Sequence, residues 1–406
     1  MKKIALIVSK FPCYDEAFIL REIHALSQQM DVMIFSLKPS KEKIIHDEAR
    51  ELLDKTVYVP YIFSARILTA QIEMFLKCPS DYLRAFFQLV LENLHNPEFL
   101  LKNLIFFPKA VYLAKWIQKK GVTHLHAYWA TYPTSVALAA SQIAKVPFSF
   151  TGHAHDIYLD TVHLREKMRR AQFISTCTAQ NSRHLQTVAP NVSPEKILVN
   201  YHGLHLEEFS ANGKKRNEVF QILSVGTLHF YKGFNFFFQA LRILKDHGLK
   251  FHATVVGGGP LEGDLKRHLR LLELKKEVTM TGPLKQAEVI PYYKSADLFV
   301  LMAQAEWHWG IPNVLIEALA AKTPVITTRF GSVEELVEEG VTGLLVPSKD
   351  PGALAQAVER LYQNEPFRKK LADAGYRRVA EDFDLEKNIR QLAERFQHET
   401  TPALVA

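Results

Sequence analysis

The sequence predicts an α/β protein with two doubly wound parallel sheets, and three observations carry this prediction. Short β-branched runs alternate with amphipathic helical stretches along nearly the whole chain, which is the pattern of parallel sheets covered by helices on both faces. The length of 406 residues exceeds the roughly 250 to 300 residues at which a single core stops growing. A loop-rich stretch, Asn191–Lys215, separates two sets of predicted strands, so we expect two domains.

The predicted strands lie on either side of that stretch. The runs of the first set are Ile4–Val8, Asp31–Ser36, His124–Ala127, Phe148–Thr151, Phe173–Thr176 and Ile197–Val199. The runs of the second set are Gln221–Val225, His252–Val256, Val278–Thr281, Leu298–Leu301, Pro324–Thr327 and Leu344–Pro347. We therefore expect a first domain over residues 1–200, a second over 201–375, and a terminal helical segment over 376–406 that packs back on the first domain.

The composition is that of an ordinary globular chain, with 48% apolar and 23% charged residues. The cysteines are odd in number and lack short metal-ligand spacing, which indicates a reducing compartment without structural zinc. The apolar stretch Ile4–Val8 is shorter than a secretory leader needs, so we expect a first strand there. Because no run of about 18 uncharged apolar residues occurs, we expect a soluble cytoplasmic protein or one bound peripherally to the inner face of the cell membrane.

The formal net charge of +7 is concentrated in the first half of the chain. Residues 1–200 hold 24 Lys and Arg against 17 Asp and Glu, whereas residues 201–406 hold 26 of each kind. A basic first domain indicates an anionic partner, such as a phospholipid surface or a phosphate-bearing acceptor. Nucleic acid is not expected, because the sequence has neither a dense Lys/Arg stripe with interleaved aromatics nor a known nucleic-acid-binding motif.

Residues 81–120 form a helical stretch that is rich in aromatic residues and carries several lysines. Two interpretations are open. The favoured one is that the aromatics supply the apolar stripe that a helix over a parallel sheet needs. The alternative is a cationic amphipathic helix that lies in a bilayer interface.

The stretch from Gly310 to Ala320 predicts a loop that leads into a helix at the end of a strand. A proline at position 312 suits a helix start, where a missing N–H group costs nothing. The exposed N–H groups around Asn313 and Val314 form an anion site, and Glu317 follows on the same helix face one turn later. A nucleotide whose phosphate lies at the helix start would thus have a carboxylate nearby that can accept hydrogen bonds from its ribose hydroxyls. The alternative is an ordinary loop with a solvated Glu317.

A second loop, Gly226–Gly233, again joins a strand to a helix start. Its Lys232 stands where an ammonium group and a helix dipole can both meet a phosphate. The alternative is an exposed loop lysine. The glycines of Gly257–Gly259 lack the spacing of a dinucleotide-binding loop, so we expect a tight turn there.

Histidines follow or occupy two strands of the first set. His153 and Asp156 come just after a predicted strand, where ligands bind in open α/β sheets. His153 with His155, and His124 with His126, each form an H-x-H pair of the kind that can bind zinc, so a metal-dependent hydrolase is one hypothesis. The alternative is that these histidines make only local hydrogen bonds.

Together these segments resemble the retaining GT-B glycosyltransferases of the "glycosyl transferases group 1" family, family four in the sequence classification. They look most like bacterial members that build exopolysaccharide or lipid-linked surface glycans. The resembling stretches, in order along the chain, are Glu16–Ile23, His124–Ala127, Phe148–Tyr158, Gly203–Phe209, Gly226–Gly233, Val256–Leu261, Gly310–Ala320, Gly331–Leu336 and Gly343–Pro347.

The resemblance implies two Rossmann-like domains that face each other across a cleft, with the reaction in the cleft and the sugar nucleotide on the second domain. It assigns the catalytic site to His153, beside the transferring sugar, and Asp156, its acidic partner. It assigns donor binding to Thr227, Lys232, Leu284, Trp309, Gly310, Ile311, Pro312, Asn313, Val314 and Glu317.

Within that donor set the resemblance gives particular roles. Glu317 holds the donor ribose, Lys232 and the amides near Asn313 and Val314 contact the diphosphate, and the backbone at Leu284 meets the nucleobase. The family needs neither a metal nor a cofactor, and its co-substrate here would be a UDP- or GDP-linked sugar. The expected acceptor is a glycan or a lipid-linked glycan.

Two positions depart from the family pattern. The family's paired glutamates, separated by seven residues, would put the first carboxylate where this chain has Trp309. Thr227 stands where an arginine usually joins the lysine on the diphosphate. The leading hypothesis is a metal-independent retaining glycosyltransferase, and the alternative is a non-catalytic GT-B protein that binds a partner enzyme or a glycan.

Overall fold

The computed structural model describes residues 2–13, 16–40, 42, 45–209, 218–307 and 310–398. The chain divides into two compact units. Unit 1 consists of Met1–His202 with Glu386–Ala406, and unit 2 consists of Gly203–Leu385. Unit 2 reaches Leu385 rather than residue 375 because helix α16, Glu365–Asp382, packs on α14 of that unit.

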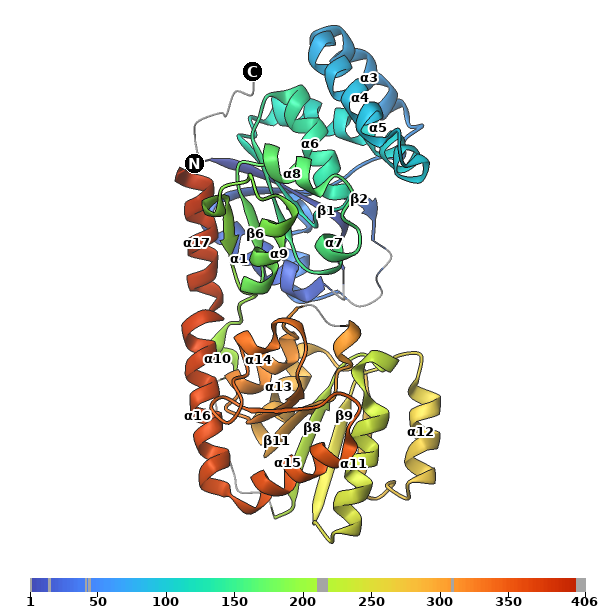
Figure 1. Cartoon of the computed structure of the whole chain (residues 1–406). Helices are drawn as coiled ribbons and strands as arrows, with labels where there is room; N and C mark the ends of the chain where they lie inside the picture. Colours follow the sequence, from blue (N-terminus) through green and yellow to red (C-terminus); the bar gives the residue numbers. More distant parts are fainter. Residues whose placement is uncertain are drawn as a thin grey trace. The chain divides into compact units, whose positions relative to one another are not determined.

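Unit 1 contains a parallel seven-stranded sheet in the order β3-β2-β1-β4-β5-β6-β7. The strands are β1 (Lys3–Phe11), β2 (Asp31–Pro39), β3 (Thr56–Tyr58), β4 (His124–Tyr128), β5 (Phe148–Gly152), β6 (Ile174–Thr176) and β7 (Ile197–Val199). In the centre, Ile4 of β1 pairs with Val32 of β2 and with His124 of β4. The central strands are buried because helices cover both faces of the sheet (Figure 1).

The helices of unit 1 include a group that is not part of the simple strand-helix alternation. The helices are α1 (Ala17–Gln29), α2 (Asp47–Glu51), α3 (Ala65–Lys77), α4 (Pro79–Asn93), α5 (Pro97–Lys120), α6 (Tyr132–Ala144), α7 (His155–Tyr158), α8 (Leu164–Arg170), α9 (Ala179–Val188) and α17 (Leu385–His398). Helices α3, α4 and α5 lie between β3 and β4 and pack against one another (Figure 1). Side-chain caps from Ser64 and Asn96 begin α3 and α5.

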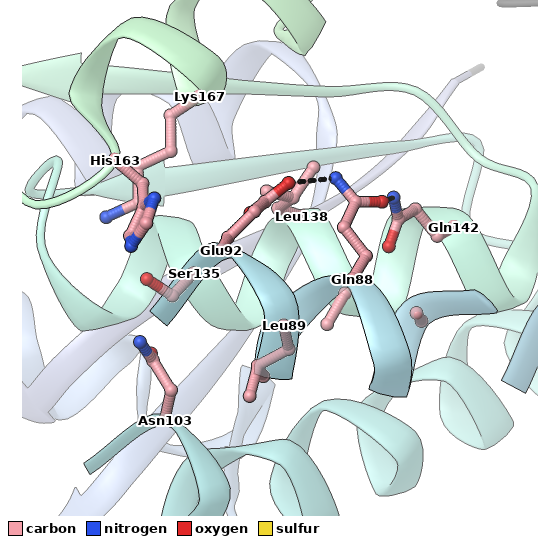
Figure 2. A pocket seen from close by; sticks show the side chains of 11 residues that line it. Gln88, Leu89, Glu92, Asn103, Ser135, Leu138, Gln142, His163 and Lys167 are labelled. Carbon is pink, nitrogen blue, oxygen red and sulfur yellow. Dashed lines mark hydrogen bonds between the residues drawn. The ribbon is translucent and has the colours of Figure 1, made fainter. Parts of the chain in front are cut away.

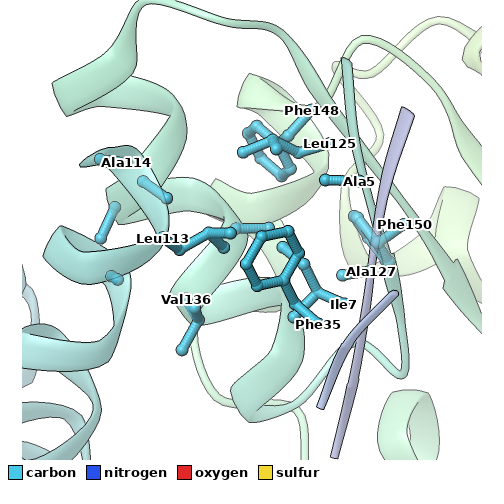
Figure 3. Close-up of a cluster of buried hydrophobic side chains, with 14 of the residues drawn as sticks. Ala5, Ile7, Phe35, Leu113, Ala114, Leu125, Ala127, Val136, Phe148 and Phe150 are labelled. Carbon is cyan, nitrogen blue, oxygen red and sulfur yellow. The ribbon is translucent and has the colours of Figure 1, made fainter. Parts of the chain in front are cut away.

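The core of unit 1 forms where α5 and α6 lie on the sheet. Figure 3 shows Leu113 of α5 and Val136 of α6 meeting buried side chains of the central strands, among them Phe35 and Phe150. Most of the aromatic side chains of residues 81–120 pack on this core: Tyr82, Phe86, Phe106, Phe107, Tyr112 and Trp116. The core interpretation of these aromatics is therefore confirmed.

Unit 2 contains a parallel six-stranded sheet in the order β10-β9-β8-β11-β12-β13. The strands are β8 (Phe220–Val225), β9 (Phe251–Val256), β10 (Val278–Gly282), β11 (Leu298–Leu301), β12 (Val325–Thr328) and β13 (Leu344–Val346). Its other helices are α10 (Leu206–Phe209), α11 (Phe234–Asp246), α12 (Glu262–Leu271), α13 (Gln286–Ser295), α14 (Asn313–Ala320) and α15 (Pro351–Gln363). The strand order reverses between β8 and β11, which makes this point the topological switch of the sheet.

The last helix, α17, belongs to unit 1, as expected for the terminal segment. The ring of Phe396 lies 5.2 Å from the rings of both His124 and His126, measured between centroids, and 5.3 Å from Phe173. The ammonium of Lys2 donates a hydrogen bond of 2.9 Å to the carbonyl oxygen of Phe396. Among the described residues, no helix is long and apolar enough to cross a membrane.

Candidate functional site

The predicted donor residues of unit 2 lie at the switch point of its sheet. In a parallel sheet, the loops after neighbouring strands meet at one edge. The loop after β8 carries Lys232, and the loop after β11 leads into α14. Gln304 ties the two loops together, because its backbone N–H donates to the carbonyl of Tyr231 and its side-chain amide to that of Phe230, each at 2.8 Å.

Two glycines allow these loops to approach one another closely. Gly233 has a φ of +68°, and a Cβ at this position would lie 1.8 Å from the carbonyl oxygen of Met302. Gly257 has a φ of +142°, and its Cβ would lie 2.0 Å from the carbonyl oxygen of Gly226. A side chain at either position would push the loops apart. The turn that the sequence predicts at Gly257–Gly259 lies instead at Pro260 and Leu261, where the N–H of Glu262 donates to the carbonyl of Gly259 at 3.2 Å.

Lys232 is held in a short 3-10 turn, Phe230–Lys232, directly before α11. Its side chain is half-buried, and its Nζ atom lies 5.5 Å from the centre of the Tyr231 ring. Desolvation by the surrounding protein lowers the pKa of Lys232 from 10.5 to about 8. Near neutral pH the group is therefore still a cation, but one with weakened hydration. Thr227 lies exposed on the same loop.

The start of α14 is partly exposed and has no side-chain cap. Pro312 is the N-cap residue and has an extended backbone, so α14 begins at Asn313 rather than at the proline. The Gly310–Val314 stretch, which includes Ile311, is half-buried, and a Cβ built on Gly310 would meet no atom within 4 Å. The first N–H groups of a helix have no acceptor within the helix itself, and Asn313 and Val314 are partly exposed here. Trp309 lies outside the described residues.

Glu317 lies one turn into α14, where a buried tyrosine orients its carboxylate. The hydroxyl of Tyr293, on α13, donates a hydrogen bond of 2.9 Å to Oε2 of Glu317. Tyr293 is itself 1% exposed, and its backbone carbonyl accepts from the hydroxyl of Thr323. The sequence analysis missed Tyr293, because nothing in the spacing of residues 293 and 317 connects them.

Leu284 follows β10 at the same edge of the sheet. It is half-buried and comes after Gly282, which has a φ of +79°, and Pro283. A Cβ on Gly258 would lie 3.2 Å from the Pro283 ring, so the loops after β9 and β10 are neighbours. Lys232, Leu284 and the start of α14, which were all predicted to bind the donor, thus follow strands at the same edge of the sheet.

In unit 1, His153 is buried directly after β5. Its ring lies 4.4 Å from that of Trp129 and 5.2 Å from those of Phe18 and His202. Burial lowers the pKa of His153 to about 3, so the imidazole is neutral. Neither ring nitrogen has a hydrogen-bond partner within the part of the chain that the structure describes. The arrangement presents two polar nitrogens in an aromatic surrounding.

Asp156 holds the backbone around His153. Its Oδ1 accepts hydrogen bonds of 3.0 Å from the N–H groups of His153 and Ala154, and its Oδ2 accepts one of 2.7 Å from Ala130. Burial raises the pKa of Asp156, while these backbone hydrogen bonds act in the opposite direction. The carboxylate therefore joins the loop after β5 to the loop after β4 and fixes the position of His153.

Further buried polar groups near this loop were not singled out from the sequence. Glu22 of α1 is 5% exposed, burial raises its pKa to about 7, and Asn200 donates to it at 3.4 Å. Phe18 and Glu22 both belong to Glu16–Ile23, one of the resembling stretches. The resemblance of Glu16–Ile23 to the family was therefore the one sequence feature that could have pointed to these residues. The sequence of the stretch does not tell which of its side chains are buried.

The other H-x-H pair, His124 and His126, is part of the core. Their ring nitrogens lie 2.7 and 2.8 Å from the hydroxyl of Ser149, and His126 also bonds to Thr151 at 2.9 Å. Burial lowers the pKa of His124 to about 3. Local hydrogen bonding therefore accounts for this pair, and the hydrolase hypothesis gains no support. Over the described ranges, no group of three His, Cys, Asp or Glu side chains is placed to hold a metal ion.

A small pocket lies among α4, α5, α6 and α8 of unit 1 (Figure 2). Polar side chains line it, including Gln88, Glu92 and Lys167. The ammonium of Lys167 donates hydrogen bonds to the carbonyls of Ala130 at 2.7 Å and Thr131 at 3.1 Å, which supports the loop that Asp156 also holds. The cavity volume of about 30 Å³ suits a water molecule rather than a sugar.

Comparison with known proteins gives the following matches. Residues 206–378 match the family model described as Glycosyl transferases group 1. The chain is 36% identical over 213 residues to "Amylovoran biosynthesis glycosyltransferase AmsK" of Erwinia amylovora, covering 51% of this chain and 52% of the relative. It is 29% identical over 286 residues to "Putative teichuronic acid biosynthesis glycosyltransferase TuaC" of Bacillus subtilis (strain 168), covering 67% and 70%. The matched region thus spans about half the length of the first relative and about two thirds of the second.

Solved structures show the same fold at low sequence identity. A glycosyltransferase from Rickettsia africae ESF-5 matches with a TM-score of 0.73 and 17% identity over 99% of this chain and all of the other. Anabaena Alr3699/HepE in complex with UDP matches with a TM-score of 0.71 and 16% identity over 98% of this chain and all of the other. The predicted fold class, two Rossmann-like parallel-sheet domains of the GT-B type, is confirmed.

Proposed function

Because residues 206–378 match the model of the Glycosyl transferases group 1 family, we propose that this chain belongs to that family and transfers a sugar from a nucleoside diphosphate to a surface-glycan or lipid-linked acceptor. We propose further that the transfer retains the configuration of the sugar and needs no metal. The names of the two curated relatives, in amylovoran and teichuronic acid biosynthesis, support a polysaccharide product. The UDP in the Anabaena structure supports a nucleotide donor.

One observation carries the proposal: Lys232 and the open start of α14 follow the two strands that flank the switch point, and Glu317 stands one turn into that helix. The helix N–H groups and the ammonium suit a diphosphate, which carries the charge that they attract. Tyr293 orients the Glu317 carboxylate, which suits the hydroxyls of a ribose one turn away. The diphosphate and the ribose of a sugar nucleotide thus each have a candidate partner on unit 2.

The proposed chemistry requires these groups to stabilise the leaving diphosphate. The bond between the anomeric carbon and the diphosphate oxygen breaks, the acceptor oxygen bonds to that carbon, and its proton leaves with the diphosphate. Negative charge grows on the diphosphate, where Lys232 and the start of α14 would stabilise it. The neutral imidazole of His153 would hydrogen-bond a hydroxyl of the transferring sugar, with Asp156 as a positioning residue.

A transfer assay tests this proposal. Purified protein is incubated with radiolabelled UDP- and GDP-sugars, with chelator and a lipid extract as acceptor source, and the product's anomeric configuration is read by NMR. We expect label to enter the lipid-linked fraction with the donor's configuration, and Lys232→Met and His153→Ala to abolish it. An inverted product, or transfer only without chelator, would contradict the proposed mechanism. Nucleotide binding without any transfer would favour the non-catalytic alternative.

A further inference from the structure

Lys167 is a buried cation of unit 1 that bonds to backbone carbonyls. It belongs to α8 and is 2% exposed. Its ammonium donates to two successive carbonyls of the loop after β4, those of Ala130 and Thr131. Desolvation lowers the pKa of Lys167 to about 8, so the group is still charged near neutral pH. Because burying a charge is costly, its position calls for a reason other than packing.

Lys167 and Asp156 hold Ala130 from two sides. The backbone N–H of Ala130 donates to Oδ2 of Asp156 at 2.7 Å, and its carbonyl accepts from Nζ of Lys167, also at 2.7 Å. Hydrogen bonds to charged groups are stronger than those between neutral groups. The two buried side chains therefore fix both peptide groups that flank this residue. We call this arrangement the Ala130 clamp.

The residue before the Ala130 clamp has an unusual backbone conformation. Trp129 has a φ of +84°, in the left-handed region that bulky side chains rarely adopt. Its N–H donates to the carbonyl of Thr151 at 3.0 Å, and its own carbonyl accepts from the hydroxyl of Thr134 at 2.7 Å. A strained residue persists only where its surroundings determine its conformation several times over. These two hydrogen bonds and the Ala130 clamp do so for Trp129.

The conformation of Trp129 places its indole against the imidazole of His153, with 4.4 Å between the ring centroids. The backbone of His153 is fixed as well, since its N–H donates to Oδ1 of Asp156 and its carbonyl accepts from the side-chain amide of Asn181. Strained and tightly held residues of this kind are concentrated at functional sites. The two rings therefore form one rigid unit.

The ring nitrogens of this unit lack the partners that its backbone has. Within the described ranges, no protein group bonds to Nε1 of Trp129 or to either ring nitrogen of His153, although all three atoms are buried. An unpaired buried polar atom is costly and calls for an explanation such as a ligand. An indole N–H and a neutral imidazole, next to each other, suit a ligand that carries several hydroxyls.

We propose that Lys167 is a positioning residue of the sugar site. Through the Ala130 clamp it keeps Trp129 in the left-handed conformation, so that the indole N–H and the imidazole of His153 meet hydroxyls of one sugar. A pyranose fits this chemistry, because its apolar face packs on an aromatic ring while its hydroxyls bond to the nitrogens. The identity of the sugar rests on the proposed function, whereas the position of Trp129 does not.

Transfer kinetics with free UDP or GDP as the competing inhibitor tests the sugar contact. Lys167→Met keeps the length of the side chain but removes its hydrogen-bond donors, and Trp129→Phe keeps a ring but removes the N–H. We expect each variant to lower kcat/KM for the sugar nucleotide about ten- to a hundredfold. The inhibition constant of the free nucleotide, which reports on unit 2, should stay unchanged.

The double variant tests whether Lys167 acts through Trp129. If it does, the losses are not additive, and Lys167→Met should cost little once Trp129→Phe is present. Thr134→Val offers a second way to release Trp129, because it removes the hydroxyl that holds the Trp129 carbonyl, and we expect a loss of about three- to tenfold. The matched control is Lys196→Met. Lys196 also donates to a backbone carbonyl, but it precedes β7 and so lies at the opposite edge of the sheet, and its variant should behave like the original protein.

Tryptophan fluorescence reports the position of Trp129 without any substrate. The emission of Trp129 is the difference between a protein and the same protein with Trp129→Phe. In Lys167→Met we expect this emission to shift to longer wavelength and to be quenched more readily by acrylamide, because the indole is no longer held in place. Circular dichroism and nucleotide titration establish that each variant is folded and that the unit 2 site is intact.

Several results would overturn the positioning role of Lys167. They are an unchanged kcat/KM in Lys167→Met, additive losses in the double variant, or a Trp129 emission that does not respond to Lys167→Met. No transfer by the original protein would refute the proposed function instead, and the fluorescence of Lys167→Met would still decide whether Lys167 positions Trp129.

Discussion

The hydrogen bond from Tyr293 to Glu317 is the residue-scale feature that most directly supports a ribose site. A carboxylate that must accept from two ribose hydroxyls benefits from a fixed orientation, and the buried tyrosine provides it. Glu317 itself could be predicted from its place one turn into a helix, since that spacing is visible in the sequence. Tyr293 could not, because it comes from a different helix and meets Glu317 only after the sheet has formed.

We expect Tyr293→Phe to weaken UDP or GDP binding about three- to tenfold, because the substitution removes a single hydrogen bond to a charged oxygen and leaves the ring in place. Isothermal titration measures this change. The neighbouring tyrosine offers a matched control, and Tyr292→Phe should leave the affinity unchanged. Equal affinities for Tyr293→Phe and the original protein would show that the orientation of Glu317 is unimportant for the nucleotide.

Lys232 predicts a pH dependence of nucleotide affinity. Its pKa is lowered to about 8, so the free protein loses this cation as the pH rises through that value. A diphosphate binds the charged form, so we expect the affinity to fall about tenfold per pH unit above about pH 8. Titrations from about pH 7 to about pH 9.5 measure the slope. Arginine stays charged over this range, so the affinity of Lys232→Arg should change little with pH. An equally steep fall in affinity in that variant would assign the pH dependence to another group.

Asp156 illustrates the limit of sequence reasoning for a single residue. The sequence places it beside His153, and the resemblance assigns it to the sugar site. The structure shows both of its oxygens occupied by backbone N–H groups of two loops. Partners such as Ala130 come from another strand end, and the sequence gives no sign of which backbone groups a carboxylate will meet.

At the scale of elements, the strands and the helical character of residues 81–120 were predictable, whereas α3 and strand β3 were not. Runs such as Ile4–Val8 are buried on both faces, so their sequences are continuously apolar. β3 was missed because it has only three residues, none of them fully buried. Exposed apolar residues of α3 and α4, such as Ile72 and Leu91, were also missed, since an apolar residue at helical spacing looks the same whether it faces the core or the solvent.

The close packing of the loops after β8 and β11 predicts a specific sensitivity at Gly233. We expect Gly233→Ala to lower the free energy of unfolding by about 2 kcal/mol or more, because the residue has a φ of +68° and its Cβ would collide with the Met302 carbonyl. Thermal denaturation and nucleotide titration should both show the damage, since Lys232 is adjacent. The control is Gly263→Ala on α12, where a Cβ meets nothing within 4 Å and stability should be unchanged or slightly higher.

At the scale of the whole molecule, the chain returns to unit 1 through α17 after completing unit 2. The terminal helix was predicted from the helical pattern at the end of the chain, but its contacts were not. The Phe396 ring is 1% exposed and lies against His124, His126 and Phe173. The last helix is therefore part of the core of unit 1.

We expect Phe396→Ala to destabilise unit 1 by about 3 to 5 kcal/mol, the usual range for removing a buried phenyl ring. Differential scanning calorimetry with and without UDP or GDP shows which unit is affected. A nucleotide would raise the transition temperature of unit 2, so we expect the lowered transition, that of unit 1, to stay unchanged when nucleotide is added. Gln397→Ala, at the exposed neighbouring position, serves as the control and should melt like the original protein. A lowered transition that the nucleotide raises would place the damage in unit 2 instead.

The central claim is that unit 2 is a nucleotide-binding domain built on Lys232, the start of α14 and Glu317. Its most direct test is isothermal titration of the purified chain with UDP and with GDP, in the presence of chelator, alongside Glu317→Ala. We predict that one nucleotide binds at micromolar affinity or tighter and that the variant loses about ten- to a hundredfold of it. No binding of either nucleotide, or equal binding by Glu317→Ala, would contradict the claim.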